Sequence, residues 1–299
     1  MLKFSLVSYL RKLYRHSINS PWLDKKIYFV LDALTDCYSR LRGYSFPNNY
    51  IRRWKLDMLW ELYEKETVAV FKKIIKEDMI VVDIGAHIGY YTRIFSKMVG
   101  SGGMVLAFEA DPENFLLLKK NTQHLENVKI FQLALSDHAG IIDFYHCLEK
   151  AGCHTTLANA PLNFKMQKIS VQANTLDTVL TQENITNVEV IKIDIEGGEA
   201  AALTGMAQTM QINKNLAIVT EFAPAWIKAA GKDPLTVLQQ FKNNNFSIYA
   251  IANNKLSLIT PINKESYEVF IPKFHPNGSA YNQFVNLYCA KGIFLKLIE

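Results

Sequence analysis

The sequence of 299 residues has only four cysteines and no apolar run long enough to cross a membrane. The cysteines, at positions 37, 147, 153 and 289, are too scattered for a dense disulfide framework, which favours a reducing compartment. A membrane-spanning helix needs about 18 consecutive apolar residues, and no segment reaches that length. The N-terminus lacks the apolar stretch and the small-residue cleavage site of a signal peptide. These absences predict a cytoplasmic globular protein.

Flexible linkers, internal repeats and a strong excess of one charge are also absent. The net charge is +5, from 33 basic and 28 acidic residues, and does not indicate a nucleic-acid partner. The hydrophobic share of 49% is typical of a chain that buries a full core. We expect one large domain over residues 61–299, preceded by a helical extension over residues 1–60.

The helical extension begins with an amphipathic stretch. Within residues 1–16, apolar residues recur at helical spacing and basic residues occupy the remaining face. Such a helix either packs on its own protein or on a second copy of the chain, as in a homodimer, or makes a peripheral contact with an anionic membrane. Packing is the favoured interpretation. A second helix is expected to start at Ser20-Pro21, with a break over 40–49 and a further helix over 59–76.

The segment Met79–Thr92 predicts a strand, a glycine loop and a helix. Residues 79–82 are all large and aliphatic, as in a buried parallel strand. Asp83 ends this run, and Gly85 and Gly89 bracket a tight turn before residues that recur at helical spacing. This pattern is typical of the opening of a nucleotide-type α/β fold.

The glycine loop lacks the features that bind phosphates. It has no Gly-Lys-Ser/Thr ending, and its glycines are four residues apart (89 − 85) rather than in the G-x-G-x-x-G pattern. The carboxylate of Asp83 would repel a pyrophosphate but suits a cationic ligand. S-adenosylmethionine has a sulfonium and a free amino group but no phosphate, so we expect it to be the cofactor.

An acid also ends the next predicted strand. Residues 104–108 are followed by Glu109, 24 positions after Gly85 (109 − 85), where a carboxylate accepts hydrogen bonds from ribose hydroxyls. NAD-binding proteins share this feature. An NAD-dependent oxidoreductase of Rossmann type therefore stays open at this point, as does a non-catalytic cofactor-binding or interaction domain.

Strands and helices alternate along most of the remaining sequence, which predicts a doubly wound, mostly parallel sheet. Residues 246–299 should complete it with an antiparallel end. The predicted strands cover 128–134, 141–145, 187–193 and 216–220, and the predicted helices cover 90–98, 112–124, 197–210 and 235–244.

Four motifs, in this order, resemble the FkbM family of S-adenosylmethionine-dependent methyltransferases: DIGAHIGYYT at 83–92, FEADPENF at 108–115, ALSD at 134–137 and IKIDIEGGE at 191–199. The resemblance covers residues 61–222. It implies an α/β class I methyltransferase (Rossmann-like) fold. It also implies methyl transfer to a hydroxyl of a sugar, a glycan or another small molecule.

The carboxyl ends of parallel strands meet at one edge of a sheet, so the acids that end these strands should converge there. The resemblance implies that Ala134 and Leu135 flank the adenine, whereas Ser136 with Asp137 could instead form a capping turn. The residues expected to surround the cofactor are Asp83, Gly85, Ala86, His87, Gly89, Glu109, Ala110, Ala134, Leu135, Ser136 and Asp194.

Methyl transfer to an alcohol requires that the acceptor oxygen be positioned and relieved of its proton. The predicted catalytic residues are Asp194, Glu196, Lys192 and Glu221. Lys192 and Asp194 share one face of their strand, so the lysine would stay charged and could place a substrate anion or neutralise an alkoxide. A purely structural ion pair of Lys192 is the alternative.

No metal is expected at the site. Mg²⁺ held by Asp194, Glu196 and Glu221 is an alternative that the resemblance does not require. Five residues separate Cys147 from Cys153 in the segment 146–154, which is a poor match to a zinc knuckle. The resemblance implies instead that residues 152–156 lie near the acceptor, and that Asp177 fixes a structural turn.

Overall fold

A computed structural model of the chain describes residues 21–47, 50–149, 152–161, 163–270 and 283–296, with side chains from residue 29 onward. The predicted amphipathic helix within residues 1–16 lies outside this range. In the part of the chain that the structure describes, no helix is long and apolar enough to span a bilayer.

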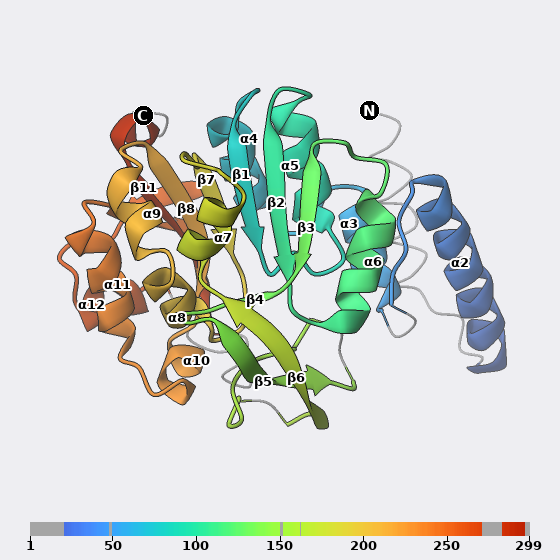
Figure 1. Cartoon of the computed structure of the whole chain (residues 1–299). Helices are drawn as coiled ribbons and strands as arrows, with labels where there is room; N and C mark the ends of the chain where they lie inside the picture. The colour runs from blue at the N-terminus through green and yellow to red at the C-terminus, as the bar shows by residue number, and fades with distance from the viewer. Residues whose placement is uncertain (1–20, 48–49, 150–151, 162, 271–282, 297–299) are drawn as a thin grey trace.

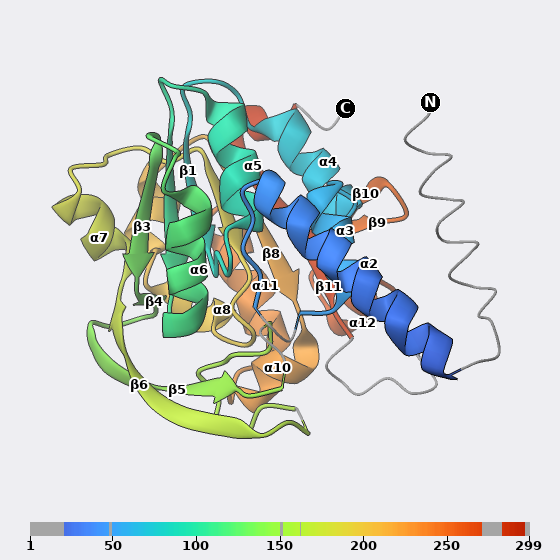
Figure 2. The same cartoon turned by 90° about the vertical axis from the view of Figure 1, so that its right-hand side faces the viewer.

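The centre of the molecule is an eight-stranded sheet with helices on both sides (Figures 1 and 2). Its strand order is β10-β9-β11-β8-β7-β1-β2-β3, and β11 runs antiparallel to both of its neighbours. The doubly wound sheet with an antiparallel end is therefore confirmed. The strands are β1 (Ile80–Ile84), β2 (Met104–Glu109), β3 (Val128–Gln132), β7 (Val190–Ile193), β8 (Leu216–Phe222), β9 (Ser247–Ala252), β10 (Lys255–Leu258) and β11 (Val285–Lys291).

Helices bury both faces of the central sheet. Successive side chains of a strand point to opposite sides, so each strand contributes to both cores. In β1, Val81 packs on the side of α4 and α5, whereas Val82 packs on the side of α7, α8, α9 and α11. Both valines are fully buried. The bounds of these and the other helices are α4 (Lys65–Ile74), α5 (Tyr90–Val99), α6 (Pro112–Thr122), α7 (Leu176–Gln182), α8 (Glu199–Thr204), α9 (Ala207–Ile212), α10 (Pro224–Ala229), α11 (Pro234–Asn243), α12 (Lys264–Glu268) and the 3₁₀ helix η2 (Gly292–Leu295).

A second, three-stranded sheet lies below the carboxyl ends of β1, β2 and β3 in Figure 1. It consists of β4 (Ala134–Leu135), β6 (Met166–Asn174) and β5 (Gly140–Cys147), in that order. The prediction of one strand over 128–134 was wrong at its end, because the chain leaves the central sheet at Leu133 and Ala134 pairs with Ala173 of β6.

The predicted helix over 59–76 is interrupted. The structure has α3 (Arg52–Leu59) and α4 separated by a turn at 60–64, in which Glu61 and Glu64 adopt left-handed backbone angles (φ 54° and 44°). α3 is fixed to the long helix α2 (Pro21–Leu41) by two ion pairs, Arg52–Asp32 at 2.5 Å and Lys55–Asp36 at 2.8 Å (Figure 2).

The predicted helix over 197–210 is also split, into α8 and α9. Gly205 lies at the break, where a Cβ atom would come within 1.9 Å of the Ser136 carbonyl oxygen. Glycine therefore permits a backbone contact that connects the helix pair to the end of β4. By contrast, the predicted start of α6 is confirmed, because Asp111 caps it by accepting hydrogen bonds from the N–H groups of Glu113 and Asn114.

Asp177, in the first turn of α7, fixes the turn that begins α9, in agreement with its predicted structural role. Its carboxylate accepts hydrogen bonds from Gln208 N, Thr209 N and Thr209 Oγ1 at 2.9, 2.8 and 2.5 Å. We expect Asp177→Ala to lower the free energy of unfolding by about 2–3 kcal/mol, because two backbone donors lose a charged acceptor. Urea denaturation measures this change. The exposed Gln182→Ala on the same helix should stay within about 0.5 kcal/mol of the parent chain, and equal effects of the two variants would contradict the assignment.

Candidate active site

A cavity of about 730 Å³ opens where the parallel strands end. Its walls come from the glycine loop, the ends of β2, β7 and β8, the second sheet with its following loop, and the segment from Tyr50 to Glu64. Ligands of doubly wound sheets bind at this edge. Of the predicted residues, those that line the cavity are Gly85, Ala86, His87, Glu109, Ala110, Ala134, Leu135, Ser136, Lys192, Asp194, Glu196 and Glu221.

The glycine loop rests directly on the end of β7. Gly85 has a positive φ of 75°, and a Cβ atom there would lie 1.8 Å from the carbonyl oxygen of Asp194. The N–H groups of Gly85 and Ala86 both donate to Phe108 O, at 3.0 and 2.9 Å. His87 follows in a left-handed conformation, with its ring 5.8 Å from that of Tyr50. The loop is therefore held between β2 and β7.

Gly89 does not line the cavity, unlike the other predicted glycine. It precedes α5 with a φ of 89°, and a Cβ atom there would lie 2.9 Å from Leu118 Cδ1. The structure thus places Gly89 where the loop packs against α6.

Glu109 is buried at the end of β2, and backbone groups hold its carboxylate. Oε2 accepts from His87 N at 2.7 Å, and Oε1 accepts from Asp111 N at 2.8 Å. Burial raises the pKa of Glu109 to about 7. A carboxylate oxygen has two acceptor sites, so each oxygen of Glu109 can take one further hydrogen bond from the cavity side.

The wall beyond Glu109 is largely apolar. Ala110 packs against a small cluster that contains Ala134 and Phe144, and Ala134 and Leu135 are both buried. Ser136 hydrogen-bonds Asp137 through its side chain at 3.3 Å. This part of the cavity is an apolar surface suited to packing against the flat ring of a nucleobase.

Lys192 lies at the centre of the charged part of the site. Its ammonium is 3.4 Å from Asp83 Oδ1 and 3.4 Å from Asp194 Oδ2, and it donates to Gly85 O at 3.1 Å. Burial alone would lower the pKa of Lys192, but the carboxylates of Asp194, Asp83 and Glu64 outweigh this effect and hold the pKa above its ordinary value. Lys192 is therefore a cation.

Asp83 was predicted to contact a cationic ligand directly, but the structure places its carboxylate outside the cavity lining. Asp83 is fully buried, does not line the cavity, and accepts a hydrogen bond from Thr92 Oγ1 at 2.6 Å. Because a buried carboxylate needs a counter-charge, its partner is Lys192 rather than a ligand. Asp83 and Asp194 nevertheless share one lysine and so belong to one network.

Three further carboxylates face the cavity near Asp194. Burial first, and Asp194 next, raise the pKa of Glu196 well above its ordinary value. Burial and then Glu196 do the same for Glu221. Burial and Asp194 also raise the pKa of Glu64, although the hydroxyl of Tyr91 donates to its Oε2 at 2.7 Å. The backbone of Glu196 is left-handed (φ 46°).

Sequence reasoning missed Glu64 and the aromatic residues around it. Tyr50, Trp54 and Tyr63 line the cavity together with Glu64, all within the segment that we expected to be extension or helix. The rings of Tyr50 and Trp54 pack edge to face, 5.7 Å apart. The turn at 60–64 brings Tyr63 and Glu64 to this wall, and the turn contains no glycine or proline.

The loop after β5 also reaches the site. Thr155 Oγ1 donates to Glu196 O at 2.7 Å, and a Cβ atom on Gly197 would lie 2.5 Å from Leu157 Cδ1. Cys153, His154 and Thr156 line the cavity. The second sheet is thereby fixed to the loop that follows β7.

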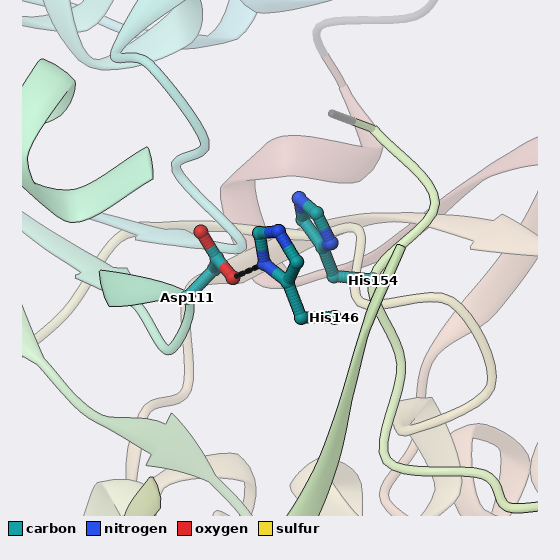
Figure 3. Close-up of side chains that lie close together, drawn as sticks. All are labelled: Asp111, His146 and His154. Atoms are coloured by element: carbon teal, nitrogen blue, oxygen red, sulfur yellow. Dashed lines mark hydrogen bonds and ion pairs between the residues drawn. The ribbon is translucent and has the colours of Figure 1, made fainter. Parts of the chain in front are cut away.

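Figure 3 shows a cluster beside the cavity that has the composition of a metal site: Asp111, His146 and His154. One ligand atom from each lies within 4.8 Å of the others. However, Nδ1 of His146 is 2.5 Å from Asp111 Oδ2, and Nδ1 of His154 accepts from Cys147 N at 2.9 Å. The two imidazoles stack at 4.5 Å. A metal could therefore reach these rings only through their Nε2 atoms.

The alternative Mg²⁺ site has no ready-made geometry. In the described ranges of the chain, the cluster that brings three such ligand atoms together is the histidine cluster of Figure 3, and not Asp194, Glu196 and Glu221. Cys147 and Cys153, whose spacing is a poor match to a zinc knuckle, are both buried and do not form a disulfide. Neither lies within the cluster.

The composition of the cavity fits S-adenosylmethionine better than a dinucleotide. Among the described residues that line it, there is a lysine at 192 but no arginine, and the lysine already neutralises two carboxylates. A pyrophosphate would find no cation of its own. Glu109 has oxygens available for ribose hydroxyls, and carboxylates suit a sulfonium and an ammonium.

Five parallel strands, an antiparallel β11 inserted between β8 and β9, and an acid-lined cavity at the strand ends define a class I methyltransferase fold. The family described as the methyltransferase FkbM domain matches residues 83–248. The chain belongs to this family.

Two curated relatives and one solved structure illustrate the similarity. The 2-O-methyltransferase NoeI of Sinorhizobium fredii is 24% identical over 160 residues, which are 50% of this chain and 65% of that protein. The hexuronic acid methyltransferase AglP of Haloferax volcanii is 25% identical over 150 residues, 50% of this chain and 58% of that protein. The chain thus spans less than two thirds of each relative. A methyltransferase FkbM structure from Methylobacillus flagellatus superposes with a TM-score of 0.42 and 13% identity, covering 85% of this chain and 57% of that one.

The raised pKa of Glu109 predicts a pH-dependent stability. Because the pKa rises from 4.5 to about 7 on folding, this carboxyl favours the folded state below pH 4.5, and the advantage is lost as the pH rises through about 7. Glu109→Gln stays neutral throughout. We therefore compare the free energy of unfolding of Glu109→Gln with that of the parent chain. The difference, variant minus parent, should increase by at most about 3 kcal/mol as the pH rises from 4.5 through about 7.

Urea denaturation without ligand, repeated across this pH range, measures the difference. The matched variant Glu113→Gln, whose side chain is 81% exposed, should follow the parent chain at every pH. A constant offset between Glu109→Gln and the parent chain would contradict the raised pKa.

Proposed function

We propose that the chain is an S-adenosylmethionine-dependent methyltransferase that methylates a hydroxyl of a sugar, a glycan or another small molecule. The observation that carries the proposal is the convergence of the glycine loop, Glu109 and the Lys192–Asp194 pair on one cavity at the ends of the parallel strands. Family membership supports methyl transfer. The printed names of the two relatives, a 2-O-methyltransferase and a hexuronic acid methyltransferase, support an oxygen acceptor on a sugar-type ring.

Each predicted cofactor residue has a part in this proposal. Glu109 holds the ribose hydroxyls, and Ala110, Ala134, Leu135 and Ser136 cover the adenine. Gly85, Ala86 and His87 present the loop backbone to the amino-acid end, whereas Asp83 and Gly89 support the loop from behind. When bound, the cofactor supplies a methyl group that its sulfonium activates.

Asp194 is the residue that we assign to accept the proton of the acceptor hydroxyl. Its side chain is 37% exposed, and its Oδ2 lies 3.4 Å from the ammonium of Lys192. As the acceptor oxygen bonds to the methyl group, the bond from the methyl carbon to sulfur would break with its electron pair left on sulfur, and the hydroxyl proton would pass to this carboxylate. Glu196 and Glu221 line the cavity beside Asp194, and their carboxyl groups orient the acceptor through hydrogen bonds to its other hydroxyls.

Calorimetry with two ligands, S-adenosylhomocysteine and NAD, tests the cofactor assignment. We expect S-adenosylhomocysteine to bind to the full chain and NAD not to bind. Glu109→Gln should weaken the binding at least about tenfold, because the ribose loses a charged acceptor. The control Glu113→Gln, on the first turn of α6 but outside the cavity lining, should bind like the parent chain. Binding of NAD instead would overturn the proposal in favour of an oxidoreductase.

A turnover assay distinguishes an enzyme from a domain that binds the cofactor without transferring a methyl group. Transfer of labelled methyl from S-adenosylmethionine is followed across a panel of sugar nucleotides, glycans and lipid-linked sugars. We expect Asp194→Asn to bind S-adenosylhomocysteine normally but to lose turnover by about 10²-fold or more. Cofactor binding without transfer to any member of the panel would point to a non-catalytic domain.

A further inference from the structure

We propose that the acceptor end of the cavity selects a ring that is uncharged or positively charged and rejects a ring that carries a carboxylate. The selecting group is Glu64, Asp194, Glu196 and Glu221, called here the carboxylate box. This inference rests on the proposed function and specifies its substrate class. The hexuronic acid in the name of the Haloferax relative belongs to the class that the box rejects.

The first step of the argument is that Glu64 is built into the site. It follows the turn between α3 and α4 in a left-handed conformation (φ 44°, ψ 43°), which costs about 1 kcal/mol or more for a residue other than glycine. Tyr91, from the helix after the glycine loop, donates its hydroxyl to Glu64 Oε2 at 2.7 Å. A strained backbone and a specific donor together hold this carboxylate against the cavity.

The second step is that the box has little spare positive charge. Lys192 is the lysine that lines the cavity in the described residues, and its ammonium already lies 3.4 Å from each of Asp83 and Asp194. His154 lies on the adjoining loop, but its Nδ1 is already engaged by the N–H of Cys147 at 2.9 Å. An incoming carboxylate would therefore meet carboxyl groups without an unshared cation.

The third step concerns the hydrogen bonds that the box still needs. Glu196 Oε2 is buried and has no hydrogen-bond partner among the described residues. Thr155 Oγ1 holds the Glu196 backbone in place through its carbonyl at 2.7 Å. A buried acceptor of this kind is costly until a donor reaches it. Hydroxyl or ammonium groups of an acceptor ring supply such donors, whereas a carboxylate supplies none.

Mutual repulsion within the box supports the same conclusion. Burial and Asp194 raise the pKa values of Glu64 and Glu196, and burial and Glu196 raise that of Glu221. The addition of another anion would increase this repulsion, and an ammonium would relieve it. Trp54 and Tyr50 also line the cavity, and aromatic rings attract cations and the C–H faces of uncharged rings.

The test compares three ring ligands of one shape: methyl β-glucopyranoside, the corresponding methyl glucuronide and the corresponding methyl 2-amino-2-deoxyglucoside. Calorimetry measures their binding to the full chain saturated with S-adenosylhomocysteine. We expect the glucuronide to bind at least about tenfold more weakly than the glucoside, and the amino sugar to bind at least as tightly as the glucoside.

Glu64→Gln should reduce the ratio of the glucoside affinity to the glucuronide affinity at least threefold. The substitution removes one carboxylate and leaves an amide oxygen that accepts the hydrogen bond of the Tyr91 hydroxyl. The matched control is Glu61→Gln. Glu61 lies in the same turn, but its carboxylate pairs with Lys72 at 3.0 Å and is 43% exposed. This control should leave the ratio unchanged.

Equal or tighter binding of the glucuronide overturns the inference. So does a Glu64→Gln variant whose ratio matches that of Glu61→Gln. If S-adenosylhomocysteine binds but none of the three rings does, the carboxylate box is rejected and the proposed function stands. If S-adenosylhomocysteine itself does not bind, the proposed function fails first.

Discussion

The buried ammonium of Lys192 is the interaction on which the site depends. It pairs with Asp83 at the end of β1 and with Asp194 beyond the end of β7, two neighbouring strands of the sheet. It also donates to the carbonyl of Gly85 and so fixes the loop that connects β1 to α5. Removal of this cation would leave two carboxylates facing each other in a poorly solvated place, which is strongly unfavourable. The glycine loop and Asp194 are thus held by a single charge.

A second constraint is the close approach of backbones around the same point. Gly85 touches the carbonyl of Asp194, and Gly205 touches the carbonyl of Ser136. Such contacts leave no room for a side chain, so the loops that carry the site are fixed by main-chain packing as well as by charge. The second sheet is connected in turn through Thr155 and Glu196. The walls of the cavity therefore come from distant parts of the sequence but form a continuous set of contacts.

The central sheet could be predicted because its signals are local. The aliphatic run before Asp83, the glycines after it and the Asp-Pro start of α6 each determine their own backbone. Parallel strands then bring their acidic ends together by topology, which placed Glu109, Asp194 and Glu221 at one cavity. Asp83 was harder to place, since only the position of Lys192 shows that its carboxylate points into the protein.

The parts that could not be predicted depend on long-range packing. The turn that delivers Glu64 uses left-handed glutamates, residues whose intrinsic preferences point to helix. Tertiary contacts, among them the Tyr91 hydroxyl, stabilise that turn, and no local pattern encodes them. Likewise, nothing near Leu133 indicates that the chain leaves one sheet for another, because strand propensity is the same on both sides.

The turn before α4 also divides the molecule in a way that has evolutionary meaning. Residues up to Glu64 supply the aromatic wall and one acid, whereas the residues that complete the cavity come from residue 84 onward. Substitutions confined to the amino-terminal part can therefore reshape one wall of the cavity while the glycine loop and the ends of the parallel strands stay unchanged.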